Sequence, residues 1–236
     1  MRPGPDVGRG RDVARPEGVG QGGPVSEHVG TGSPRWSEVY SRGTAGFVEV
    51  VRGLSPAQVR AGVPACPGWT VHDLLAHQAG SSTDVVRGNL DGVTTAPWTA
   101  RQVEDRRDRT VAALVAEWEA NVPTVAAWCD AASGPNPAWD VAVHLSDLRE
   151  AVGLPPAPVE SGWGAVLEAA VDLLREQGAT VSVAQRGLDP GGTTWHVATA
   201  YGLWRGVFSR LDRPALEREV LRGDVDGFRR AAFLAD

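Results

Sequence analysis

One segment of the chain constrains its fold more than any other: residues 139–149, which read WDVAVHLSDLR. Successive residues of a helix turn by about 100°, so Asp140, His144 and Asp147 fall within one narrow sector. The neighbouring sector is apolar and contains Val141, Leu145, Leu148 and Val152. The segment therefore predicts a helix in which a packing face lies beside a face of metal-binding side chains.

Both ends of this helix are marked in the sequence. Asn136 supplies a capping side chain, and Pro137 fits the first turn, where its missing N–H is not needed. Gly153 and the LPP run that follows it end the helical pattern. The metal-binding face thus belongs to a well-bounded element.

The composition is that of an ordinary globular protein. The 236 residues can bury one good core or two modest ones, and 42% of them are hydrophobic and 22% charged. The sequence contains neither the run of about 18 apolar residues that a membrane helix needs nor the apolar core of a signal peptide. It therefore predicts a cytoplasmic protein that binds no membrane. A net charge of −6 argues against general binding to nucleic acid.

Three parts are expected along the chain. Residues 1–33 are rich in Gly, Pro and Arg without a hydrophobic period, which favours a disordered tail. Residues 34–154 show helical periodicity and predict a four-helix bundle, so the chain is expected to be mostly α-helical. Residues 159–236 mix helix and strand patterns after a Pro-rich stretch, which predicts a small α/β domain.

The periodicity also predicts the individual elements. In the bundle we expect helices over residues 36–54, a short turn after Ser55, a helix from Thr70, a helix over 110–129 with a kink or break at Pro123, and a helix over 136–153. In the second part we expect a helix over residues 165–177, a β-hairpin formed by 179–186 and 193–199, short helices over 203–210 and 214–221, and a last helix near the C-terminus.

A third candidate ligand lies on the helix that begins at Thr70. Thr70 can cap this helix, and the negative charge of Asp73 at the third position favours a helix N-terminus. His77 lies at the border of the apolar stripe, where it can face a pocket between helices. His72 points to the other flank and is expected to be exposed.

His77, Asp140 and His144 together suit a divalent metal ion. Side chains four residues apart on a helix have Cβ atoms about 6 Å apart, so Asp140 and His144 can bind one ion, and His77 from a facing helix supplies a third ligand. Two neutral imidazoles and one carboxylate suit zinc or another first-row ion, and three ligands leave positions open for water or substrate. Asp147 is expected outside this ligand set, where it orients an imidazole or pairs with an arginine. The Asp-x-x-x-His spacing by itself also arises by chance on surface helices.

Three segments carry a resemblance to a known family. Residues 63–77 read VPACPGWTVHDLLAH, residues 139–149 contain Asp140 and His144, and residues 203–213 read LWRGVFSRLDR. Together these segments resemble the mycothiol-dependent maleylpyruvate isomerase family, over about residues 34–233.

The resemblance implies a DinB-like four-helix bundle followed by a small α/β domain of the sterol-carrier type. It implies a divalent metal, in the first place zinc, bound by His77, Asp140 and His144, and mycothiol as the thiol cofactor. The implied activity is that of a metal-dependent isomerase or thiol S-transferase. The activated thiol would isomerise a small electrophile such as maleylpyruvate, or be transferred to it. No catalytic residue is assigned beyond the metal site.

Two interpretations remain open for other reactive side chains. Arg205, Arg210 and Arg213 either bind carboxylates of the cofactor or substrate, or are solvated surface arginines. Cys66 lies in a Pro-rich turn and is interpreted as a small packed residue rather than as the nucleophile. Neither Cys66 nor Cys129 has a paired spacing, so free thiols are expected.

A second hypothesis keeps the same fold without catalysis. A non-catalytic module that binds a metal or a small ligand would bind electrophiles without turnover. The enzyme hypothesis requires two small-molecule partners, an electrophile and a low-molecular-weight thiol. Both hypotheses are compatible with a monomer and with a homodimer.

Overall fold

The computed structural model describes residues 35–184 and 193–233. The described residues all belong to one compact unit, which spans Ser33–Asp236. The expected disordered tail, residues 1–33, lies outside the described residues, and so does the part of the expected hairpin at residues 185–192.

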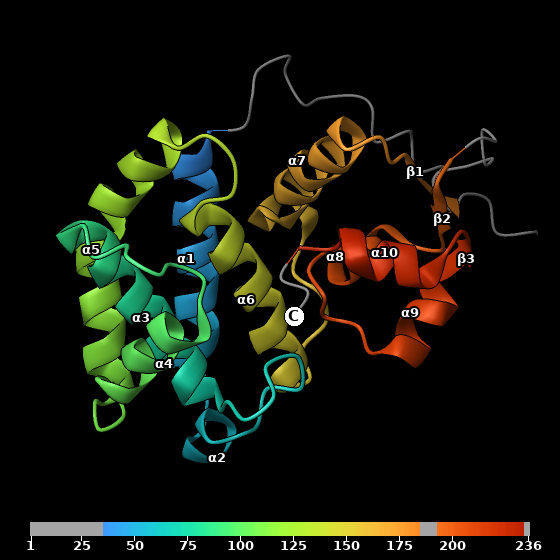
Figure 1. Cartoon of the computed structure of the whole chain (residues 1–236). Coiled ribbons are helices and arrows are strands. Elements are labelled where there is room, and N and C mark those ends of the chain that lie inside the picture. The colour runs from blue at the N-terminus through green and yellow to red at the C-terminus, as the bar shows by residue number, and fades with distance from the viewer. Residues whose placement is uncertain (1–34, 185–192, 234–236) are drawn as a thin grey trace, which may run out of the picture. The chain divides into compact units, whose positions relative to one another are not determined.

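A helical bundle forms the first part of the described chain (Figure 1). Its long helices are α1 (Trp36–Arg52), α3 (Val71–Arg87), α5 (Val111–Ala131) and α6 (Pro137–Ala151), and its short ones are α2 (Pro56–Val59) and α4 (Ala96–Glu104). Helix α5 packs against α1 and α3, and α6 packs against α1 and contacts α3. The expected bundle is confirmed. Helix α4 was not predicted.

The two helices that carry the candidate ligands begin at side-chain caps. The Thr70 hydroxyl accepts from the Asp73 N–H, and the Asp73 carboxylate accepts from the Thr70 N–H, which forms a capping box at the start of α3. The Asn136 amide oxygen accepts from the Ala138 N–H at 2.9 Å, and Pro137 is the first residue of α6. Local sequence thus fixes where both helices start.

The core of the bundle contains the apolar stripe expected on α6. Val141, Leu145 and Leu148 are buried. Helix α5 runs through Pro123 without the expected break. Among the described helices, none is both long enough and apolar enough to cross a membrane.

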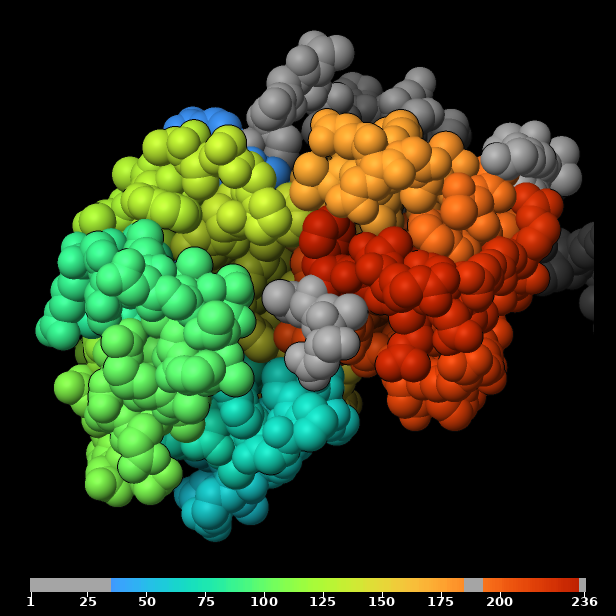
Figure 2. Space-filling model, viewed as in Figure 1, coloured from blue at the N-terminus to red at the C-terminus, as the bar shows by residue number. Residues whose placement is uncertain are grey.

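The second part of the chain is a mixed α/β region (Figure 1). It consists of a 3-10 turn (Val159–Ser161), α7 (Trp163–Glu176), β1 (Val181–Val183), β2 (Trp195–Val197), α8 (Ala200–Val207), α9 (Arg213–Glu219), β3 (Val220–Arg222) and α10 (Val225–Ala231). Figure 2 shows its side chains, coloured orange to red, gathered in one continuous body.

The sheet of this region corrects two predictions. Its strand order is β1-β2-β3, with β2 parallel to β1 and antiparallel to β3. The expected hairpin of residues 179–186 and 193–199 is therefore wrong, because a hairpin joins antiparallel strands. Each of these two strands has 3 residues. The helix expected over residues 214–221 ends at Glu219, because the next residues pair with β2 as β3.

Candidate metal centre

The three predicted ligand side chains converge between α3 and α6. His77 Nε2 lies 3.4 Å from Asp140 Oδ2, and His144 Nε2 lies 3.4 Å from Asp140 Oδ1. One possible ligand atom from each residue lies within 4.8 Å of the other two. Both imidazoles are buried, whereas 35% of the Asp140 side chain is exposed. The group can hold a divalent cation and remains open on the Asp140 side.

The outer nitrogen of His77 is bonded to Gln102, which comes from α4. The His77 Nδ1 lies 2.8 Å from Gln102 Oε1, and Gln102 Nε2 donates to Asp84 Oδ2 at 2.7 Å. Because the amide nitrogen is committed to a carboxylate, the amide oxygen must accept from the His77 Nδ1–H. This bond leaves Nε2 as the nitrogen that can ligate a metal.

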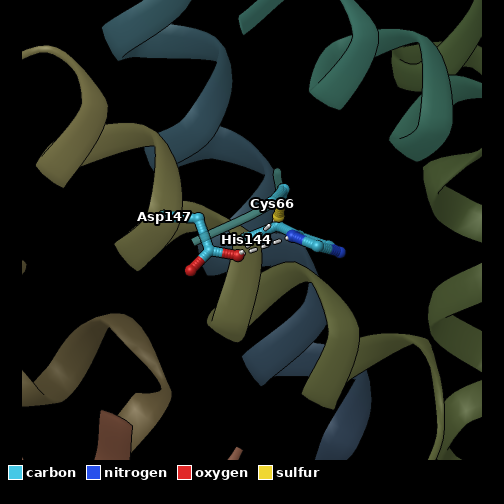
Figure 3. Close-up of side chains that lie close together, drawn as sticks. All are labelled: Cys66, His144 and Asp147. Atoms are coloured by element: carbon cyan, nitrogen blue, oxygen red, sulfur yellow. Dashed lines mark hydrogen bonds and ion pairs between the residues drawn. The ribbon is translucent and has the colours of Figure 1, made fainter. Parts of the chain in front are cut away.

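The outer nitrogen of His144 is bonded to Asp147, one turn further along α6. The distance from His144 Nδ1 to Asp147 Oδ2 is 2.9 Å. The Asp147 carboxylate is buried and also accepts from Arg205 Nη2 at 2.5 Å and from Arg210 Nε at 3.2 Å. Figure 3 shows His144 and Asp147 pointing toward one another, with Cys66 beside them. His144 therefore has the same arrangement as His77, with Nδ1 held and Nε2 directed at Asp140.

The charges of the group favour a cation at its centre. Burial by itself raises the pKa of Asp140, but the facing imidazoles of His144 and His77 lower that pKa well below its usual range. Burial by itself lowers the pKa of His144, whereas Asp140 and Asp147 raise that pKa well above its usual value. The two carboxylates thus stabilise a positive charge at His144. In the free protein a proton on the imidazole supplies this charge, and a bound metal ion would supply it in place of the proton.

Two tryptophan side chains pack beside the imidazoles. The ring centroid of Trp69 lies 5.3 Å from that of His77 and 6.3 Å from that of His144. The Trp98 ring meets His77 edge-on at 6.4 Å. Trp69 comes from the turn before α3 and Trp98 from α4, so elements outside the long helices complete the surroundings of the group.

Cys66 adds a thiol on the outer side of the group (Figure 3). Its Sγ lies 3.6 Å from Asp147 Oδ2, and possible ligand atoms of Cys66, His144 and Asp147 lie within 4.8 Å of one another. A second cation among these three is disfavoured, because Arg205 and Arg210 already place two positive charges on Asp147. The geometry fits a half-buried thiol that donates to Asp147.

The three arginines named from the sequence lie in different surroundings. Arg205 is buried against Asp147. Arg210 contacts the same carboxylate, and 12% of its side chain is exposed. Arg213 lies at the surface, paired with two acidic side chains, and is not brought to the group. Of the two arginines at Asp147, Arg210 is thus the more exposed.

Sequence reasoning missed two amides that hold the ligands. Gln78 Nε2 donates to Asp140 Oδ2 at 2.6 Å, and its place directly after His77 on α3 was a usable signal. Gln102 had no such signal, because it lies on a short helix that was not predicted. Its approach depends on Gly80, where a Cβ would lie 2.6 Å from Gln102 Cβ.

His72 departs from its predicted surroundings. It is half-buried rather than exposed, and its Nε2 lies 2.8 Å from the Arg109 carbonyl. Arg109 directly precedes the N-cap of α5, so this segment contacts the flank of α3 that carries His72.

Two imidazoles and a carboxylate on facing helices, with each imidazole held at its outer nitrogen, define a helical-bundle protein with a candidate metal centre. The family model described as the mycothiol maleylpyruvate isomerase N-terminal domain matches residues 40–159, about half of the chain. The chain belongs to this family. The match includes His77, Asp140 and His144 and ends before Arg205. No curated protein and no solved structure gives a significant match.

Proposed function

We propose that the chain is a metal-dependent enzyme that uses mycothiol to isomerise a small electrophile such as maleylpyruvate, or transfers the thiol to it. The observation that carries this proposal is the convergence of the His77 and His144 Nε2 atoms on Asp140 while both Nδ1 atoms are held from outside. The description of the family, which names mycothiol and maleylpyruvate, supports the choice of thiol and electrophile.

The donor set fits zinc or a similar divalent ion. His77, Asp140 and His144 would hold it, and Gln78 would keep the Asp140 carboxylate in place. When bound, such an ion would lower the pKa of an incoming thiol and stabilise the thiolate, which is the nucleophile.

The chain's own side chains supply the other requirements of this chemistry. Trp69 and Trp98 shield the imidazoles from water. Arg210, which is partly exposed beside Asp147, would pair with a carboxylate of the electrophile. Cys66 is directed at Asp147 rather than at the Nε2 atoms, so an external thiol, not Cys66, is the proposed nucleophile.

Isomerisation by a thiol leaves the balance of atoms and electrons unchanged. The sulfur forms a bond to one carbon of the cis double bond, and the electron pair moves toward a neighbouring carbonyl. The remaining single bond rotates, and expulsion of the sulfur restores the double bond in the trans form. In transfer to an electrophile the sulfur–carbon bond would persist instead.

We also propose a division of labour along the chain. Residues 34–154 would form the metal-binding domain, and residues 159–236 a small α/β domain that contributes Arg205 and Arg210. The contacts of Arg205 and Arg210 with Asp147 support a contribution of the second part to the site.

Metal content tests the proposal first. Protein purified without chelators or an affinity metal should contain about one divalent ion per chain by mass spectrometry, and His77→Ala and His144→Ala should both lose it. His72→Ala is the matched control and should keep it, because His72 bonds a backbone carbonyl outside the group. A native chain that takes up no metal overturns the proposal.

Turnover separates the two hypotheses. Metal-loaded protein should convert maleylpyruvate only when mycothiol is added, and His144→Ala should abolish the conversion. Binding of thiol and electrophile without conversion would favour the non-catalytic binding module.

A further inference from the structure

We propose that Arg205 is a positioning residue of the metal centre, which acts by holding Asp147 and, through Asp147, the His144 imidazole. The inference rests on the metal centre proposed above. It concerns a residue beyond the part of the chain that the family model matches, residues 40–159.

Helix α8 is hydrogen-bonded to the face of α6 that carries Asp147. Three side chains of α8 bond to it within little more than one turn. These bonds are Trp204 Nε1 to Ser146 Oγ at 3.0 Å, Arg205 Nη2 to Asp147 Oδ1 at 2.5 Å, and Tyr201 OH to Glu150 Oε1 at 2.8 Å. Arg205 Nη2 also donates to Glu150 Oε2 at 2.9 Å. The guanidinium is therefore held in one place relative to α6.

Stability alone does not account for Arg205. The residue is 1% exposed, and its Nε and Nη1 atoms have no hydrogen-bond partner among the described residues. A buried N–H without a partner costs free energy, and apolar replacements of buried ion pairs are often neutral or stabilising. A buried guanidinium that bonds through one nitrogen is thus less favourable for stability than an apolar side chain that fills the same space would be in a fully apolar replacement of the pair.

The contact with Asp147 gives Arg205 a consequence at the metal centre. Arg205 holds Oδ1, while Oδ2 accepts from His144 Nδ1. Arg210 also contacts Oδ2, so the two arginines bind opposite oxygens of one carboxylate. Without Arg205 the Asp147 carboxylate would lose its bond at Oδ1, and the His144 ring would be held by a less restrained partner. Loss of such outer partners lowers metal affinity about 10- to 100-fold.

Zinc affinity of the full chain tests the inference. Metal-free Arg205→Met should bind zinc about 10- to 100-fold more weakly than the native chain in competition with a chromophoric chelator. Metal-free Arg205→Met should still unfold cooperatively in urea, at a lower midpoint than the native chain, because the buried Asp147 loses one of its cationic partners. Arg205→Lys, which restores a cation near Asp147, should recover part of the affinity. The visible spectrum of bound cobalt should change in Arg205→Met, because Asp147 would hold the His144 ring less firmly.

A double-mutant cycle shows whether Arg205 acts through Asp147. Asp147→Asn should weaken zinc binding, and adding Arg205→Met should then have little further effect. Arg149→Met is the matched control. Arg149 lies on α6, two residues from Asp147, but it donates to the Pro155 carbonyl, so zinc affinity should not change.

Unchanged zinc affinity in folded Arg205→Met overturns the inference. A full additional loss in the Asp147→Asn background also overturns it. Should Arg205→Met fail to fold, Arg205→Gln takes its place with the same two criteria. A native chain that binds no zinc removes both the metal centre and this inference. A native chain that binds zinc but does not convert maleylpyruvate removes only the proposed activity.

Discussion

The amide of Gln102 joins His77 to Asp84. Its nitrogen can only donate a hydrogen bond, and its oxygen can only accept one. Its NH₂ group donates to the carboxylate, so its oxygen accepts from the imidazole. Gln102 is buried, which makes both bonds costly to lose. A neutral side chain outside the ligand set therefore determines which nitrogen of His77 faces Asp140.

Replacement of Gln102 by Leu tests this role. The variant keeps a similar volume but leaves His77 Nδ1 without its acceptor, so zinc affinity should fall about 10- to 100-fold in a chelator competition. Gln177→Leu, at the exposed end of α7, is the control and should leave zinc affinity unchanged. Native affinity in Gln102→Leu would refute the role.

Cys129 makes folding sensitive to alkaline pH. Burial raises the pKa of this thiol from an ordinary 9.0 to about 12. Because the folded protein retains the proton, the stabilisation is complete below about pH 9 and is lost as the pH rises toward about 12. In urea titrations at about pH 8 and about pH 10.5, Cys129→Ala should lose less stability than the native chain as the pH is raised. Val125→Ala removes buried volume on the same helix without removing a thiol, and it should keep the native pH dependence.

Helix α6 could be predicted from the sequence and α4 could not, for physical reasons. The α6 segment combines a cap, a first-turn proline and two adjacent stripes, so the shared face of the proposed ligands Asp140 and His144 follows from helical geometry. His77 likewise follows from its capped helix. Helix α4 is short and has two buried residues, Trp98 and Gln102, which gives little periodicity to detect. The strand pairing was wrong because three-residue strands do not encode their direction.

Gly80 links the packing of α3 against α4 to the metal centre. Replacing an exposed Gly in a helix by Ala usually stabilises the protein by up to about 1 kcal/mol. At residue 80 the added Cβ would lie 2.6 Å from Gln102 Cβ, so Gly80→Ala should destabilise the protein by about 1–3 kcal/mol in urea unfolding. Zinc binding should weaken as well, since Gln102 would be displaced from His77. Gly46→Ala, whose Cβ would meet Leu145 Cδ2 at 3.4 Å, should show neither effect.

The proposed metal ligands come from two different helices, α3 and α6, so they lie close together only in the folded protein. A ligand that binds only the folded state adds stability, by about 2.7 kcal/mol at a concentration 100-fold above its dissociation constant. Zinc should therefore raise the melting temperature of the native chain, and a chelator should reverse the increase. His144→Ala should melt at the same temperature with and without zinc. An equal zinc effect in both proteins would place the bound ion elsewhere.

The position of Trp69 gives the molecule an optical reporter of its own. Its indole stacks on one imidazole and tilts against the other, so an ion between them would lie within a few ångströms of a fluorophore. A paramagnetic ion at that distance quenches indole emission, whereas zinc does not. Occupancy of the centre could then be followed in unlabelled protein, and replacing Trp69 by Phe would reduce the signal to the part that comes from Trp98, while leaving the proposed ligands in place.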